Sequence, residues 1–193
     1  MIRIGILGDI GSGKSYIAKN FGYPVFNADL EVSKLYQKDK KIFNKLKIKL
    51  SNYIFSFPIK KNEISEAILS NKSNLKKIVK IVHPEVQKKM KLFLKKNKEK
   101  KIIILDIPLL LENKINKKSD KLIYIDSNRV EILKRLKKRK NFNLKLFKKF
   151  KEIQLPLDYK KKKSDFIIKN DFTKKNIKKS IKLILSKINK WKK

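Results

Sequence analysis

The chain has 193 residues, and 41% of them are hydrophobic, which is enough apolar material for one compact domain with a real core. It contains no cysteine, which excludes disulfide frameworks, thiolate metal sites and thiol catalysis. Its 53 basic and 17 acidic residues give a formal net charge of +36, which is typical of proteins that bind nucleic acids.

The excess positive charge comes from lysines spread along the whole chain. The arginines are Arg3, Arg129, Arg135 and Arg139, whereas dedicated phosphate-binding surfaces usually favour arginine. Lys, Asn, Ile and Phe all have A/T-rich codons, so a compositional bias is a sufficient explanation of the charge. We therefore expect no dedicated nucleic-acid partner, because charge alone supports only non-specific affinity.

The chain opens on a strand, a glycine-rich loop and a helix. The apolar run 2–7 predicts a strand, residues 14–21 predict a helix, and residues 24–27 predict a second short strand. This order is the beginning of a βαβ unit.

The middle of the chain, from about residue 30 to residue 97, predicts a helical lobe. Its apolar residues, among them Ile64, Ile68 and Leu75, recur at helical spacing, and the segment lacks a convincing strand. Pro84 stands where we expect a helix to begin, because proline is favoured in the first turn.

Two continuous apolar runs follow, 102–106 and 122–126, and each is typical of a buried parallel strand. The other elements predicted in this half are helices over 128–140, 144–154 and 156–163, a strand over 166–168, and a helix from 174 onward. Together the elements predict an α/β fold with a doubly wound, parallel five-stranded sheet and helices on both faces. We expect a single domain over residues 1–193.

The sequence gives no sign of a membrane segment. The most apolar stretch, 102–111, is interrupted by Asp106 and is shorter than the roughly 20 residues that a membrane-spanning helix needs. The first residues also lack the pattern of a signal peptide. We therefore expect a cytoplasmic protein without a membrane partner.

A glycine-rich motif stands between the first predicted strand and the first predicted helix. It matches the P-loop pattern G-x-x-x-x-G-K-[ST] in the structural context that the pattern requires. We expect Lys14 to reach the β- and γ-phosphates of ATP, and the Ser15 hydroxyl to bind Mg²⁺. The residues predicted to bind ATP here are Gly8, Asp9, Ile10, Gly11, Ser12, Gly13, Lys14, Ser15 and Tyr16.

The acceptor of the phosphoryl group needs separate evidence, because many classes of protein share a P-loop. Asp29 follows the second strand, where its carboxylate can accept a proton from an alcohol. An equally ordinary use of an aspartate there is to cap the helix that would begin at Leu30. The spacing alone leaves both roles open.

Several blocks of sequence occur together in an order that resembles the dephospho-CoA kinase family. They are the P-loop, Asn27-Ala28-Asp29, His83-Pro84, residues 106–112 (Asp-Ile-Pro-Leu-Leu-Leu-Glu), Arg135 and Arg139, residues 154–157 (Gln-Leu-Pro-Leu), Lys160, Ser164-Asp165 and Asn170. The resemblance covers residues 2–172. It implies transfer of the γ-phosphate of MgATP to the 3′-hydroxyl of the ribose of dephospho-CoA, the last step of coenzyme A synthesis. It also implies a helical acceptor-binding lobe and a helical lid, here about residues 135–163.

The resemblance assigns roles to individual residues. Asp29 matches the general base, and Arg139 matches a lid arginine that closes over ATP. His83 is expected either to contact the acceptor or to cap the helix at Pro84. The resemblance does not require an acid at position 106, but Asp106 ends its predicted strand where a Walker-B carboxylate would sit, so it is a candidate for an indirect magnesium contact. The block Pro108, Leu109, Leu110 and Glu112 is expected to shape the acceptor pocket, although its leucines fit a hydrophobic core equally well.

Some positions depart from the family pattern, notably Asp9, Asn27 and Ser33. Asp9 replaces a glycine, and its charge is expected to weaken ATP binding unless the side chain points to solvent. The alternatives are a nucleoside or nucleoside-monophosphate kinase, or a catalytically weakened, basic protein that binds nucleotides or nucleic acids. We expect a monomer or a weak homo-oligomer.

Overall fold

The computed structural model describes residues 1–140 and 142–190. The chain divides into two compact units. The first unit comprises residues 1–27, 97–142 and 151–193, and the second comprises residues 28–96 and 143–150.

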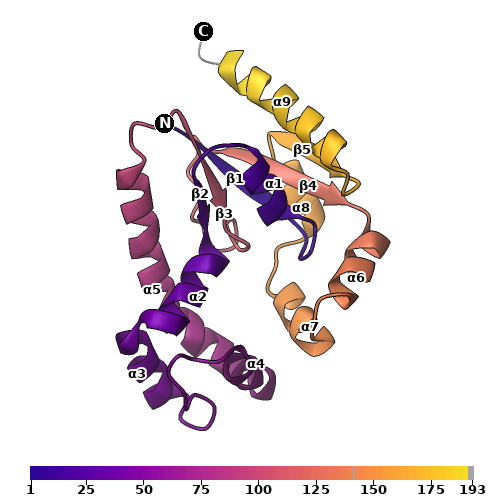
Figure 1. The fold of residues 1–193 in the computed structure, drawn as a ribbon. Helices are drawn as coiled ribbons and strands as arrows, with labels where there is room; N and C mark the ends of the chain where they lie inside the picture. The colour runs from indigo at the N-terminus through magenta and orange to yellow at the C-terminus, as the bar shows by residue number, and fades with distance from the viewer. Residues whose placement is uncertain (141, 191–193) are drawn as a thin grey trace. The chain divides into compact units, whose positions relative to one another are not determined.

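The first unit is built on a five-stranded sheet in which every strand pairing is parallel. The strand order is β2-β3-β1-β4-β5 (Figure 1). The strands are β1 (Ile2–Gly8), β2 (Val25–Asn27), β3 (Ile102–Asp106), β4 (Lys121–Ser127) and β5 (Phe166–Asn170). This arrangement confirms the predicted α/β fold, and the predicted strand ends agree to within two residues.

Helices cover both faces of this sheet. Helices α1 (Lys14–Asn20) and α9 (Lys174–Lys190) pack on one face, where mostly isoleucine side chains form the core. On the opposite face Leu110 lies directly against Gly5 of β1, and helix α8 (Leu157–Lys162) contacts the same strand. Because all strands run parallel, their carboxyl ends lie at one edge of the sheet, and the chain leaves β1 there as the glycine-rich loop.

The second unit is helical. Helices α2 (Ala28–Lys38), α3 (Lys40–Lys49) and α4 (Lys61–Ser70) all contact the long helix α5 (Lys72–Lys96). Helix α7 (Leu144–Glu152) reaches this unit with residues 144–150, where Lys149 donates hydrogen bonds to the carbonyls of Ile68 and Leu69. These carbonyls belong to the last turn of α4, where free acceptors are expected.

Pro84 does not begin a helix, so that prediction is wrong. It lies inside α5, which is continuous over 25 residues. A proline within a helix costs one backbone hydrogen bond, and here the burial of Ile78 and Val82 before it and Val86 after it compensates for that loss. The prediction weighed local propensity alone and missed this buried stripe.

Helix α5 is long enough to span a bilayer but carries many lysines along its length. Across residues 1–140 and 142–190, no helix combines the length and the apolar composition of a membrane span.

Candidate active site

The phosphate loop connects β1 to α1 and depends on glycine at three positions. Gly8, Gly11 and Gly13 have φ values of 144°, 84° and 89°, which side chains rarely adopt. Space is short as well: a Cβ atom on Gly8 would lie 2.8 Å from the carbonyl oxygen of Ile125, and one on Gly13 would lie 2.8 Å from Nδ2 of Asn170. The glycines are therefore required by both backbone conformation and packing.

Two side chains from neighbouring strands hold this loop in place. The Ser127 hydroxyl and the Asn170 amide both donate to the carbonyl oxygen of Ser12, over 3.0 and 2.8 Å. Ser127 ends β4 and Asn170 ends β5, so parallel pairing brings both to the loop. Sequence reasoning did not identify Ser127, although its place at the carboxyl end of a predicted parallel strand was a usable signal.

Lys14 is buried within the loop that it follows. Its ammonium group donates to the carbonyl oxygens of Gly8 and Asp9, over 3.2 and 2.7 Å. Ser15 and Tyr16 continue into the first turn of α1 and are exposed. A positive charge and the amino end of a helix therefore meet at one place, which is the arrangement that binds phosphate groups.

The carboxylate of Asp9 does not point to solvent. One of its oxygens accepts the backbone N–H of Ile10 over 2.7 Å, and the other lies 2.9 Å from the ammonium group of Lys151. Only 8% of the Asp9 side chain is exposed. The sequence analysis expected Asp9 to weaken ATP binding unless its side chain points to solvent, and the side chain does not point there. It did not identify Lys151 as the partner of Asp9.

Helix α6 (Arg129–Lys137) packs directly on the phosphate loop. A Cβ atom on Gly11 would lie about 3 Å from the side chains of Ile132 and Leu136 in this helix. Arg139 follows α6 and is exposed, and its backbone N–H donates to the Leu136 carbonyl. Within the first unit, the structure thus brings the helix that precedes the predicted lid arginine into contact with the phosphate loop.

A second arginine near this loop stacks on an aromatic ring. The guanidinium carbon of Arg135 lies 4.1 Å from the ring centre of Phe172, within the range of a cation–π interaction. Phe172 has a φ of 62°, unusual for a residue with a side chain, and its N–H donates to the Asn170 side chain.

A buried acid lies at the carboxyl end of β3. Asp106 is 2% exposed and accepts a hydrogen bond from the Asn27 amide, which stands opposite it in the paired strand β2. An aspartate at position 27 would place two carboxylates against each other, so the amide is the better partner for this acid. In the part of the chain described, no group of three or more His, Cys, Asp or Glu side chains is placed to hold a metal by itself.

The block around residue 112 contacts the segment that carries Gln154 and Leu155. Glu112 accepts the backbone N–H of Leu155 over 3.0 Å and forms an ion pair of 2.5 Å with Lys160. Leu110 is fully buried against Gly5, so it lies in the hydrophobic core. This is the alternative that the sequence analysis gave for the leucines of this block. The other two predicted pocket residues, Pro108 and Leu109, are half-buried.

Asp29 and His83 belong to the second unit. Helix α2 begins at Ala28, so Asp29 lies in its first turn and the predicted helix cap ahead of Leu30 is wrong. The strand runs directly into the helix without an intervening residue, and a carboxylate in the first turn is favoured there by the helix dipole. His83 lies half-buried in the middle of α5, which excludes the alternative that it caps a helix at Pro84.

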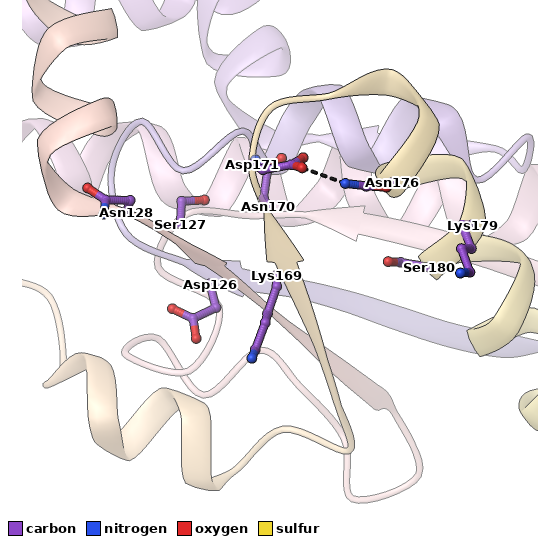
Figure 2. A pocket seen from close by; sticks show the side chains of 9 residues that line it. All are labelled: Asp126, Ser127, Asn128, Lys169, Asn170, Asp171, Asn176, Lys179 and Ser180. Atoms are coloured by element: carbon purple, nitrogen blue, oxygen red, sulfur yellow. Dashed lines mark hydrogen bonds between the residues drawn. The ribbon is translucent and has the colours of Figure 1, made fainter.

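A pocket of about 540 Å³, lined by polar and charged residues, opens at the ends of β4 and β5 (Figure 2). Two of the residues that line it, Ser127 and Asn170, are those that hold the Ser12 carbonyl, so the pocket borders the phosphate loop. The close-up shows Asp171 hydrogen-bonded to Asn176 at one side of it. Sequence reasoning had not identified this pocket.

Tyr124 of β4 is the buried phenol of this region. Its pKa is raised to about 12, chiefly by burial and in addition by the negative charges of Asp126, Asp9 and Asp158. The group therefore stays neutral over the whole physiological range.

The phosphate loop, the strand order and the helices on both faces define a nucleotide-binding fold of the P-loop NTPase class. Solved structures agree at the level of the fold: a Thermus thermophilus protein has a TM-score of 0.75 at 24% identity, covering 96% of this chain and 97% of the other. A dephospho-CoA kinase from Campylobacter jejuni has a TM-score of 0.64, also at 24% identity, with 96% of both chains covered.

Sequence comparison defines the family within that class. A family model described as Dephospho-CoA kinase matches residues 2–176. The chain is 34% identical over 190 residues to the dephospho-CoA kinase of Wolbachia sp. subsp. Brugia malayi (strain TRS), covering 96% of this chain and 97% of the relative. It is 33% identical to the enzyme of that name from Bartonella quintana (strain Toulouse), covering 86% and 87%. The chain belongs to the dephospho-CoA kinase family.

Proposed function

We propose that this protein transfers the γ-phosphate of ATP to the 3′-hydroxyl of the ribose of dephospho-CoA, which gives coenzyme A and ADP. The observation that supports this most directly is the phosphate loop with the Lys14 ammonium group inside it, in a chain of this family. Phosphoryl transfer passes through a loose transition state, so catalysis consists mainly of positioning and electrostatic stabilisation.

Each residue of the proposed site has one task. The loop N–H groups and Lys14 bind the phosphates, and Arg139 neutralises charge that develops on the transferred group. Asp29 orients the acceptor hydroxyl and takes its proton. His83 contacts the acceptor. The block that includes Pro108, Leu109, Leu110 and Glu112 shapes the acceptor pocket.

Magnesium fits the oxygen donors of the chain. The Ser15 hydroxyl would hold the ion together with the phosphates, and Asp106 would act on it indirectly. When bound, the ion neutralises phosphate charge. Asp106 is already hydrogen-bonded to Asn27, so its carboxylate has a fixed orientation.

The proposed acceptor lobe and lid correspond to the segments predicted from the sequence. Residues 30–97 form the acceptor lobe and residues 135–163 form the lid of one kinase domain over residues 1–193. We propose ATP and dephospho-CoA as its partners, a monomer or weak homo-oligomer as its state, and the cytoplasm as its location.

The test is turnover of the purified protein with MgATP and a panel of acceptors, with products identified by mass. Dephospho-CoA, nucleosides and nucleoside monophosphates are compared side by side. Formation of coenzyme A with dephospho-CoA alone is the expected result. ADP formed only with another acceptor would keep the kinase and remove the proposed substrate.

A further inference from the structure

The carboxylate of Asp9 stands in an unfavourable place for a kinase. It lies in the phosphate loop between Gly8 and Ile10, and it is 8% exposed, so water screens its charge poorly. The loop exists to hold a polyphosphate, which carries several negative charges. An uncompensated carboxylate at this position would therefore repel the ligand that the loop binds.

Lys151 supplies the missing positive charge. Its ammonium group lies 2.9 Å from Oδ2 of Asp9, and its side chain is 33% exposed. The two residues are 142 positions apart in the sequence, and both belong to the first unit. Oδ1 of the same carboxylate accepts the N–H of Ile10, so both oxygens of Asp9 have partners.

Lys14 alone does not meet this need. Its ammonium group contacts the carbonyl oxygens of Gly8 and Asp9, and in the proposed reaction it has to reach the phosphates. A lysine whose single positive charge is shared with several phosphate charges compensates the Asp9 carboxylate only in part. A second cation is needed, and Lys151 is in contact with the carboxylate.

We propose that Lys151 is a positioning residue of the nucleotide site: it neutralises Asp9 and keeps the carboxylate turned away from the phosphates, so that the loop accepts a nucleoside triphosphate. This inference rests on the proposed kinase function only in taking a nucleotide as the ligand. It concerns affinity for the polyphosphate and leaves the chemical step to other residues.

The experiment measures binding of MgADP and of a non-hydrolysable ATP analogue by calorimetry, with no acceptor present. In Lys151→Ala the buried carboxylate loses its partner, and the affinity should fall by on the order of tenfold. Lys151→Arg keeps the charge and should bind as the unchanged protein does. Lys148→Ala removes an exposed lysine from the same helix and should have no effect.

The double variant Asp9→Gly/Lys151→Ala separates compensation from direct contact. If Lys151 acts through Asp9, removing both residues restores the affinity to within a factor of about two of the unchanged protein. If the double variant binds as weakly as Lys151→Ala, Lys151 contacts the phosphates itself and the proposal is wrong. The proposal is equally wrong if Lys151→Ala lowers the melting temperature but leaves the affinity unchanged.

Kinetics provides a second readout. Lys151→Ala should raise the KM for MgATP with little change in kcat, because the effect is on nucleotide binding. Since the binding experiment needs no acceptor, its outcome is independent of whether dephospho-CoA is the substrate.

Discussion

The side chains of Lys160 and Glu112 meet at 2.5 Å, with exposed fractions of 1% and 9%. They join the block that ends at Glu112 to the segment after Gln154, two parts of the chain that are distant in sequence. A pair this deeply buried is sensitive to the loss of one member, because the remaining charge has no water to solvate it.

Replacing one member of this pair should destabilise the protein. We expect Glu112→Ala to lower the free energy of unfolding by about 3–5 kcal/mol, measured by urea denaturation. Glu99→Ala, which removes a side chain that is 86% exposed, should change it by less than about 0.5 kcal/mol. Equal stability of Glu112→Ala and the unchanged protein would show that the pair is unimportant for the fold.

Lys14→Ala should retain the fold and lose activity. Removing one preorganised cationic donor costs on the order of 10²-fold in turnover. Steady-state kinetics at saturating MgATP measures this, and circular dichroism checks the fold. Lys19→Ala, an exposed lysine of the same helix, is the control. Normal turnover of Lys14→Ala would contradict the assigned role.

Asp29→Asn tests the general base. The amide keeps the shape of the side chain but does not take a proton at neutral pH, so turnover should fall by about 10²- to 10⁴-fold. Both Asp29 and Glu31 lie in the first turn of α2, so Glu31→Gln removes a comparable helix-dipole interaction. If the two variants are equally active, Asp29 is not the base.

Tyr124 should make the protein less stable at alkaline pH. Its pKa is about 12 in the folded protein and about 10 in an unfolded chain, so the unfolded state loses the proton first. The contribution of the Tyr124 phenol to the free energy of unfolding is complete below pH 10 and is lost as the pH rises from 10 to 12. Denaturant unfolding at several pH values in this range should show that the free energy of unfolding declines less for Tyr124→Phe than for the unchanged protein. Tyr159→Phe, at a 46% exposed position, should leave the decline as it is.

The sheet was predictable because buried parallel strands appear as unbroken apolar runs, as at 102–106. The phosphate loop was predictable because its pattern is local. The position of Pro84 inside a helix was not predictable, because the burial of Val82 and Val86 on either side of it is a tertiary effect. The contacts of Asp9 with Lys151 could not be predicted for a related reason: a single sequence contains no information on which of many lysines lies near a given carboxylate.

Ser127 and Asn170 fasten the Ser12 carbonyl to the ends of two strands. A loop anchored in this way does not have to fold around an arriving triphosphate. We therefore expect the association rate constant for the nucleotide to be limited by encounter, and the slow steps of the cycle to lie in segments without such anchors. These two side chains thus bear on how quickly the site is filled as well as on how tightly it binds.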